Sequence, residues 1–442
     1  MAKMTENNLM DKIISLCKRR GFIFPSSEIY GGLANSWDYG PVGVELKNNI
    51  KQLWWKRFVQ SRDDMVGIDA ALIMNPKVWE ASGHLSNFSD PLVECKKCHT
   101  RFRADQIDTS KLCENCGAKD SFAEAQMFNL MLKTFLGPAE EAANVVYFRP
   151  ETAQAIFADF KNVLQTTRKK LPFGIAQIGK AFRNEITPGN FIFRTREFEQ
   201  MEIEYFIRPP KTDEDWQSAF EMWRKEMMGW IKEMGIDTNK IHEVEISKDK
   251  LAHYSKRTID FEYEFPFGTK ELYGLAYRTD FDLKNHSEAS KEDLSYLDPE
   301  TNERLIPHVI EPSLGVDRTV LAVLCSAFDD SNSDRVVLKF PYKLAPYKVA
   351  VFPLMKNKPE LVAKAKEIYD SLRKNFMVAW DDRGNVGKRY YSQDEIGTPF
   401  CITVDFDSLE DGAVTVRDRD TMKQERIPVS ELKDYLTQKL NF

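Results

Sequence analysis

The sequence contains no long apolar run and few cysteines. No stretch of about eighteen consecutive apolar residues occurs, which argues against a membrane-spanning helix. The segment 1–21 carries Glu6, Asp11 and Lys12 where a secretory signal needs an unbroken apolar segment, and early acidic residues argue against a transit peptide. Seven cysteines in 442 residues are too few for a disulfide scaffold. We therefore expect a soluble, cytoplasmic protein that is not bound to a membrane.

The composition is that of a folded globular protein. Hydrophobic residues make up 42% of the chain and charged residues 29%, and the 21 glycines and 20 prolines are too few for a disordered or collagen-like chain. At roughly one domain per 150 residues, the length suggests two or three domains. The net charge of −6 argues against a general polyanion binder, although local basic patches can still bind nucleic acid.

Four of the cysteines form two CxxC pairs, Cys95/Cys98 and Cys113/Cys116. Two such pairs at this spacing are typical of a small ribbon closed around a tetrahedral zinc ion. Four thiolates leave no open position for substrate, so the zinc would be structural. Buried free thiols or a redox pair are the alternatives. Basic residues outnumber acidic ones in this segment, and they either contact phosphate or are simply solvated.

The hydrophobic pattern divides the chain into a large and a small part. A helix is expected over 41–60 and a long hairpin over 173–207, with the turn-forming residues Pro188-Gly189-Asn190 in its loop. Strands in the middle of the chain with helices around them favour an α+β fold with a mostly antiparallel sheet over a Rossmann sheet. We expect domains at 1–342 and 343–442, the second of α/β type, with a cysteine-bearing insert at 92–122 and a mostly helical insertion at 208–260.

One face of the expected hairpin is rich in polar and charged residues. Arg183 lies there with Glu185 two residues further on, and Arg194 and Arg196 lie in the loop at its mouth. A guanidinium fixed in this way suits a phosphate or carboxylate that is bound by two parallel hydrogen bonds. A solvated sheet face with cross-strand ion pairs is the alternative.

Several strings are those of a known family. Phe182-Arg183-Asn184-Glu185, followed by Arg194-Thr195-Arg196-Glu197-Phe198, resembles motif 2 of the class II aminoacyl-tRNA synthetases. The string Glu311-Pro312-Ser313-Leu314-Gly315-Val316-Asp317-Arg318 resembles motif 3, and the helix, strand and proline ending at Pro76 resemble motif 1. The strings at 37–41, 79–84, 149–154 and 198–202 resemble the homodimeric glycyl-tRNA synthetases in particular. The resemblance extends from about residue 8 to the C-terminus.

The resemblance implies a fold and an activity. The fold would be a class II antiparallel sheet flanked by helices, with a C-terminal anticodon-binding domain. The enzyme would activate glycine with ATP to glycyl-adenylate and pyrophosphate, and would then transfer the glycyl group to the 3′ end of tRNA(Gly). Mg²⁺ would accompany ATP, and the enzyme would be a homodimer.

The resemblance also implies site residues. Arg183 would bridge the α-phosphate and the amino-acid carboxylate, Arg194 and Arg318 would hold the outer phosphates, and Glu271 would line the magnesium site. Phe198 would stack on adenine, with Arg318 on its other face. Arg183, Arg318 and Glu271 would be the catalytic residues. The expected ATP-binding residues are Arg183, Asn184, Glu185, Phe193, Arg194, Thr195, Arg196, Glu197, Phe198, Glu271, Leu272, Gly315, Val316, Asp317 and Arg318.

Glycine offers only its ammonium and carboxylate groups for recognition. Acidic groups converging on a small space suit the ammonium, and packed walls would exclude any larger side chain. No natural amino acid is smaller, so no editing domain is expected. The expected glycine-binding residues are Arg103, Glu151, Phe198, Glu199, Gln200, Met201, Glu202, Glu311, Pro312, Ser313, Leu314 and Gly315.

Three alternatives remain. A prolyl or threonyl enzyme would share the anticodon domain, and a non-catalytic synthetase-like subunit would be expected to lack the arginines that bind ATP. A zinc-ribbon nucleic-acid binder would account only for the cysteine segment. Within the C-terminal domain, Arg417, Arg419 and Lys423 are the candidates for anticodon contacts, with solvated charges as the alternative.

Overall fold

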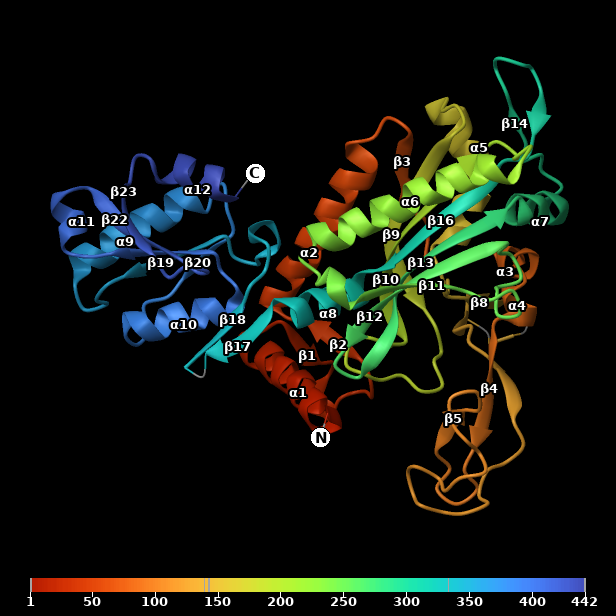
Figure 1. Ribbon diagram of the computed structural model, residues 1–442, viewed down its shortest axis with the longest axis horizontal. Coiled ribbons are helices and arrows are strands. Elements are labelled where there is room, and N and C mark those ends of the chain that lie inside the picture. The colour runs from red at the N-terminus through yellow and green to blue at the C-terminus, as the bar shows by residue number, and fades with distance from the viewer. Residues whose placement is uncertain (1, 139, 142–143, 333, 441–442) are drawn as a thin grey trace.

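The computed structural model describes residues 2–138, 140–141, 144–332 and 334–440. Figure 1 shows two bodies side by side, a larger one formed by most of the chain and a smaller C-terminal one. No helix in these ranges has both the length and the apolar character needed to cross a membrane.

A seven-stranded sheet forms the centre of the larger body. Its strands run in the order β11-β12-β13-β16-β10-β9-β3, and all neighbours are antiparallel except β3 and β9. The bounds are β11 Ile241–Glu245, β12 Arg257–Phe265, β13 Gly268–Thr279, β16 His308–Gly315, β10 Glu197–Ile207, β9 Phe173–Phe182 and β3 Met65–Ile68. The sheet confirms the predicted α+β class, and β9 with β10 is the predicted hairpin.

The two faces of this sheet differ because side chains alternate along a strand. Ile203 and Tyr205 of β10 point into a large apolar cluster that also contains Trp54, Trp223 and Trp230. Fully burying an apolar side chain of this kind contributes about 1.5–3 kcal/mol. Four helices contribute side chains to this cluster: α1 Ala2–Arg20, α2 Pro41–Trp55, α6 Asp213–Glu233 and α8 Val316–Ala327. Helix α2 begins at Pro41, as predicted, and continues into the π-helical turn η2 Lys56–Gln60.

The opposite face carries polar residues near its centre and apolar residues toward one end. Glu202 and Glu204 lie on it, and Phe206 joins a smaller apolar cluster with Phe157 and Leu283. Two helices cover this end, α5 Ala153–Thr167 and α7 Phe281–Ser290. Glu202 and Glu204 are both buried.

Arg149 fixes the chain beside β9. Its buried guanidinium donates to the carbonyl oxygens of Lys180 (2.7 Å) and Ala70 (2.8 Å). It fits because position 179 is glycine: a Cβ there would lie 2.1 Å from Nη2 of Arg149. Because Gly179 has no side chain, Arg149 has room to link β9 to the 70–71 segment.

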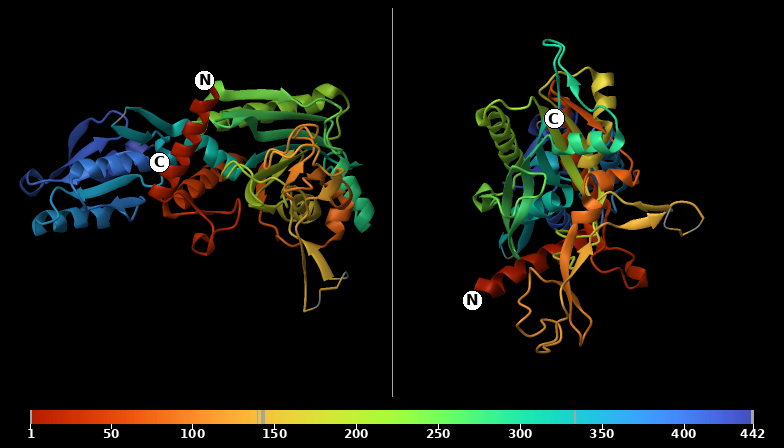
Figure 2. Two further views of the ribbon diagram at one scale, coloured as in Figure 1. Left: turned by 90° about the horizontal axis from the view of Figure 1, so that it is seen from below. Right: turned by 90° about the vertical axis from the view of Figure 1, so that its right-hand side faces the viewer.

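The cysteine-bearing insert projects from the larger body, as Figures 1 and 2 show. It includes a three-stranded sheet in the order β5-β4-β6, with bounds β4 Ser89–Glu94, β5 Arg101–Arg103 and β6 Gln126–Asn129. The short helices α3 Lys77–Ala81 and α4 His84–Asn87 precede it, and the hairpin β7 Lys133–Phe135 with β8 Val145–Tyr147 follows.

The expected helical insertion at 208–260 is only partly helical. Helix α6 occupies 213–233, but β11 and the start of β12 then join the edge of the central sheet. The second half of this range is therefore part of the main fold. The remaining small elements of the larger body are β1 Ile23–Pro25, η1 Glu28–Tyr30, β2 Trp37–Tyr39, η4 Thr238–Lys240, β14 Tyr296–Leu297, β15 Arg304–Leu305, β17 Phe328–Asn332 and β18 Arg335–Leu338.

The smaller body is a five-stranded mixed sheet with its own apolar cluster. The strand order is β20-β19-β21-β22-β23, with bounds β20 Val378–Trp380, β19 Val349–Pro353, β21 Phe400–Val404, β22 Ala413–Asp418 and β23 Gln424–Pro428. Its helices are α9 Pro359–Leu372, α10 Val386–Ile396, α11 Asp407–Glu410 and α12 Leu432–Leu440, and the turn η5 Tyr342–Leu344 leads into it. Arg335 of β18 binds buried Asp394 at 2.7 Å, which joins the two bodies.

Two of the candidate anticodon residues are buried in this structure. Arg417 is 5% exposed and forms an ion pair with Asp394, whereas Arg419 is 2% exposed and donates to the carbonyl oxygens of Gly397 and Phe340. Neither guanidinium is available to RNA, so the prediction is wrong for both. Their role is to hold the domain together, and only Lys423 remains exposed.

Candidate active site

A cavity of about 380 Å³ opens on the polar face of the central sheet. Its walls come from β10, β13 and β16, the loop between β9 and β10, and the start of α8. Guanidinium groups line one region and buried carboxyl groups another. The predicted site residues that line it are Glu151, Arg183, Glu185, Phe193, Arg194, Thr195, Phe198, Glu199, Gln200, Glu202, Glu271, Leu272, Glu311, Ser313, Gly315, Asp317 and Arg318.

The structure does not bring the other predicted residues to the cavity wall. Met201, Leu314 and Val316 belong to the large apolar cluster on the other side of the sheet. Met201 and Leu314 lie there because neighbours in a strand face opposite ways, whereas Val316 is the first residue of α8. Arg196 and Glu197 line an adjoining pocket instead. Asn184 and Pro312 are also absent from the wall.

Arg103 lies in the insert, on β5. Its guanidinium forms ion pairs with Asp90 at 2.6 Å and with Asp105 at 2.8 Å, and it does not line the cavity. Its contact with substrate remains a prediction.

Three guanidinium groups meet at one end of the cavity. Arg183, just beyond β9, donates from Nε to the carbonyl oxygen of Pro150 at 3.0 Å. Arg318, in the first turn of α8, donates to the carbonyl oxygen of Glu271 at 3.0 Å and lies 3.2 Å from its carboxylate. The charge of Arg318, and less strongly that of Arg183 and Arg194, holds the pKa of Glu271 below its ordinary value. All three cations therefore act on the Glu271 carboxylate.

Aromatic rings support two of these cations. Arg183 lies 5.3 Å from the ring centre of Phe198 and 5.4 Å from that of Phe88. Arg318 lies 4.6 Å from the ring centre of Phe193. Phe198 thus packs against Arg183, and Phe193 packs against Arg318. Contacts of this kind are attractive and limit the side-chain rotamers.

A lysine of α2 links the two sequence motifs that contribute the cavity wall. Lys47 lies 3.0 Å from both Glu199 and Asp317. Glu199 directly follows Phe198 in the chain, and Asp317 directly precedes Arg318. Tyr39 donates to Asp317 at 2.6 Å, and the amide of Glu199 donates to the same carboxylate at 2.8 Å. Burial opposes the charge on Lys47, but the two carboxylates together raise its pKa. This network sets the spacing between β10 and α8.

Glu202 is held at the other end of the cavity by neutral donors. The Thr152 amide donates to its Oε2 at 3.1 Å, with the Thr152 hydroxyl on the same oxygen, and Ser313 donates to Oε1 at 2.8 Å. Burial and then the charge of Glu151 raise the pKa of Glu202. The carboxyl group is thus fixed in orientation and would be stabilised as an anion by an entering cation.

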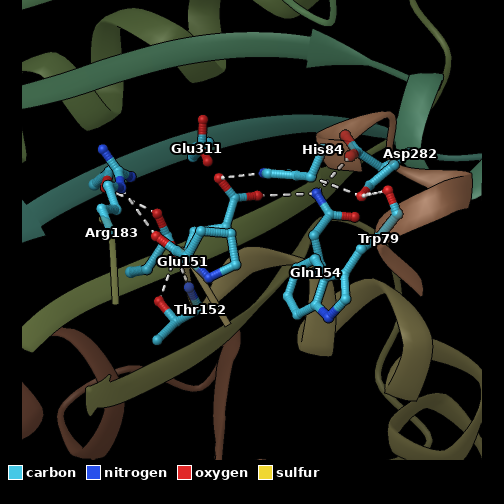
Figure 3. A network of polar contacts seen from close by, with 12 residues as sticks. Trp79, His84, Glu151, Thr152, Gln154, Arg183, Asp282 and Glu311 are labelled. Atoms are coloured by element: carbon cyan, nitrogen blue, oxygen red, sulfur yellow. Dashed lines mark hydrogen bonds and ion pairs between the residues drawn. The ribbon is translucent and has the colours of Figure 1, made fainter. Parts of the chain in front are cut away.

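Glu151 is held in a chain of buried polar groups, shown in Figure 3. Gln154 donates to its Oε1 at 3.0 Å, and Nε2 of His84 lies 3.3 Å from its Oε2. Gln154 also donates to Asp282 at 3.0 Å. Burial acts to raise the pKa of Glu151, but His84 and Arg278 more than offset it, so the pKa is lowered. Glu151 therefore supplies a negative charge at the cavity.

Arg278 of β13 is a buried cation that the sequence analysis missed. It donates to Glu311 at 2.8 Å and makes two hydrogen bonds of 2.8 Å to Asp282. Burial raises the pKa of Glu311 to about 8 despite the opposing charge of Arg278. The sequence did offer one signal for this ion pair: Arg278 stands at the end of an apolar strand, four residues before Asp282. His84 and Gln154 were also missed as site residues, although both stand in strings that carried the resemblance.

The four predicted zinc ligands come together in the insert. The Sγ atoms of Cys95 and Cys116 lie 3.8 Å apart, as do those of Cys98 and Cys113, and all four lie within 4.8 Å of one another. A zinc ion about 2.3 Å from each of four thiolates in a tetrahedron separates the sulfurs by about 3.8 Å. The residues present therefore fit zinc.

Comparison with known proteins gives the family. The model "tRNA synthetase class II core domain (G, H, P, S and T)" matches residues 138–327, and "Anticodon binding domain" matches 348–439. The glycine–tRNA ligase of Alkaliphilus oremlandii is 53% identical over 99% of this chain and 100% of its own length. Those of Bacillus cereus (strain ZK / E33L) and Geobacillus thermodenitrificans are 52% and 53% identical over 98% of this chain, and 99% and 98% of their own lengths. The chain belongs to the glycine–tRNA ligase family, within the class II aminoacyl-tRNA synthetases.

Proposed function

We propose that this protein joins glycine to tRNA(Gly) in two steps at the cavity described above. Glycine and ATP first give glycyl-adenylate and pyrophosphate. The glycyl group then moves to the 3′ end of tRNA(Gly), and AMP leaves. The observation that carries the proposal is the presence in one cavity of clustered guanidinium groups and of buried carboxyl groups around a small space.

The guanidinium end suits the activation step. The glycine carboxylate attacks the α-phosphorus in line while the bond to pyrophosphate breaks, so two anions must approach each other. Fixed cations at that point stabilise the charge that develops in the transition state. Arg183 is the residue we assign to the bridge between the carboxylate and the α-phosphate, with Arg194 and Arg318 on the outer phosphates.

Carboxyl groups near Arg318 fit the magnesium ion that accompanies ATP. Asp260 and Glu271 both line the cavity. Burial, and then the charge of Glu271, raises the pKa of Asp260 to about 7, as expected for two carboxyl groups that share a site without enough positive charge. We assign Glu271 to the ion, which binds few carboxylates together with substrate phosphates and neutralises part of their charge.

The acidic end suits the ammonium group of glycine. Glu202 and Glu311 come from β10 and β16, Glu151 comes from the loop before α5, and Ser313 orients Glu202. A substituent on Cα of the substrate would have to enter this packed region. We therefore propose that specificity rests on attraction of the ammonium and exclusion of any larger amino acid.

The remaining parts of the chain have proposed roles outside the chemistry. We assign residues 1–342 to catalysis, 343–442 to anticodon binding and the four cysteines to a structural zinc ion. The resemblance of the segment from Pro41 to Pro76 to motif 1 supports a homodimer. Aminoacylation supports a cytoplasmic location, where tRNA is charged.

The decisive experiment is ATP–pyrophosphate exchange with each of the twenty amino acids. We expect exchange with glycine, and exchange with alanine and serine lower by about a hundredfold or more because the pocket must reject an added atom. Exchange with proline or threonine instead of glycine would support the related enzymes. A folded protein without exchange on any amino acid would support the non-catalytic alternative.

The zinc assignment gives a separate prediction. Cys98→Ser should lose the metal, from about one zinc per chain, and should make the insert at 92–122 more sensitive to protease, because the insert has little apolar core of its own. Elemental analysis and limited proteolysis measure both effects. Cys325→Ser, at a buried cysteine in α8, is the matched control and should keep its zinc. A metal-free wild-type protein of undiminished stability would contradict a structural role.

A further inference from the structure

A third buried glutamate, Glu204, lies beneath the acidic end of the cavity, and the proposed function does not use it. Its side chain is 0% exposed, and neither carboxyl oxygen receives a hydrogen bond from the described residues. Among polar groups, a buried ionised carboxylate without donors is one of the most costly. A neutral acid would remove most of that cost.

The strand register sets Glu204 beside Glu311. Glu202 pairs with Ser313 and Tyr205 with Ile310, so position 204 of β10 lies opposite position 311 of β16. Opposite residues in an antiparallel pair have Cβ atoms about 4.5–5.5 Å apart. One carboxyl oxygen from each of Glu202, Glu204 and Glu311 lies within 4.8 Å of the others.

Hydrogen bonding distinguishes the two possible partners of Glu204. Both oxygens of Glu202 already accept hydrogen bonds, from Thr152 and Ser313. Glu311 accepts one from Arg278 on Oε1, which leaves Oε2 as an acceptor. A protonated Glu204 would therefore donate a hydrogen bond to Oε2 of Glu311.

The charges around Glu204 favour that proton. Arg278 faces it from β13 but already binds Asp282 of α7 and Glu311. Burial raises the pKa of both Glu204 and Glu311, but the Arg278 hydrogen bond to Glu311 opposes protonation there, so the proton belongs on Glu204. The titratable and charged groups that face this cluster are Glu151, Glu202, Tyr254, Arg278, Asp282, His286 and Glu311.

We propose that Glu204 is a neutral carboxylic acid at neutral pH and donates its hydroxyl hydrogen to Glu311, which positions the Glu311 carboxylate for the ammonium group of glycine. Glu204 is thus a positioning residue that acts through Glu311. Carboxyl groups that share one proton are an established solution to the repulsion of like charges in a buried site. The substrate in this inference rests on the proposed function, whereas the protonation of Glu204 does not.

Protonation of Glu204 has a definite effect on stability. A carboxyl group whose pKa is higher in the folded than in the unfolded state binds its proton more tightly when folded. Its contribution to stability is complete below the unfolded pKa and is lost as pH rises through the folded pKa. Glutamine at this position keeps a donor and has no proton to lose. The stability difference between Glu204→Gln and the wild type should therefore grow with pH in favour of the variant.

The experiment uses the full-length protein with Glu204→Gln and Glu204→Leu. Melting temperatures are measured from pH 5 to pH 9, and the KM for glycine and kcat are measured by pyrophosphate exchange. We expect Glu204→Gln to gain about 2 °C or more on the wild type between the two pH limits. Its KM for glycine should stay within about twofold, whereas Glu204→Leu, which has no donor, should raise KM about tenfold with a smaller change in kcat. Glu303→Gln, at an exposed acid in the β14–β15 turn, is the control and should show no pH-dependent gain.

Two results would overturn the inference. One is a melting-temperature difference between Glu204→Gln and the wild type that does not change with pH. The other is a KM for glycine raised as much by glutamine as by leucine, which would mean that the site needs a charge at position 204. Wild-type protein without glycine-dependent exchange would instead refute the proposed function, and the melting series would still test the proton on Glu204.

Discussion

Replacing Arg183 with alanine should lower glycine-dependent ATP–pyrophosphate exchange about a thousandfold or more. Arg183 is the guanidinium that we place between the attacking carboxylate and the α-phosphate, where both reactants are negative. Losing a fixed donor or cation at such a position typically costs two to five powers of ten in rate. Exchange assays at saturating glycine and ATP measure the effect on kcat directly.

Two variants serve as controls for this prediction. Arg183→Lys should recover only part of the activity, because an ammonium group cannot make two parallel hydrogen bonds. Arg304→Ala removes an exposed arginine that pairs with Asp293 and should leave exchange unchanged. Arg183→Ala should also bind its zinc normally. Exchange near the wild-type rate in Arg183→Ala would remove the basis of the catalytic assignment.

Replacing Arg278 with methionine should destabilise the protein by about 3–5 kcal/mol. The change leaves Asp282 and Glu311 without their cation, and both side chains are largely buried. Denaturant unfolding measures the loss. The loss should shrink toward acidic pH, because carboxyl groups that no longer have a partner then bind protons.

A double substitution tests the same prediction if Arg278→Met alone fails to fold. Arg278→Met combined with Glu311→Gln should recover part of the loss, since one of the uncompensated charges is then gone. Arg224→Met, at a partly exposed arginine paired with Glu221 and Glu243, should cost about 1 kcal/mol or less. Wild-type stability in Arg278→Met would show that the buried acids do not depend on this cation.

The guanidinium end of the cavity was predictable from the sequence because its residues occur in short, local strings. Arg183, Arg194 and Arg318 each stand in a recognisable motif, and the hairpin pattern that positions Arg183 is visible in the residues themselves. The same strings misled where they included neighbours: Met201 and Leu314 were expected in the glycine pocket but face the apolar cluster. Strand alternation, applied to those positions, would have excluded them.

The acidic end depends on contacts between residues far apart in the chain, which the sequence does not reveal. Arg278 meets Glu311 only because β13 and β16 are neighbours in a particular register. His84, at the start of α4, reaches Glu151 although the two residues lie far apart in the chain. Arg417 and Arg419 illustrate the opposite error. A basic cluster beside a predicted strand suggests a binding surface, but both guanidinium groups are buried and bind other groups of the same chain.

Arg149 and Gly179 limit how this scaffold can be redesigned. The arginine occupies the volume that any side chain at position 179 would need, and it is anchored by the backbone carbonyl groups of Lys180 and Ala70. A side chain introduced at position 179 would therefore displace Arg149 and break its contacts with the 70–71 segment. Codon 179 is one that a mutagenesis campaign should leave untouched.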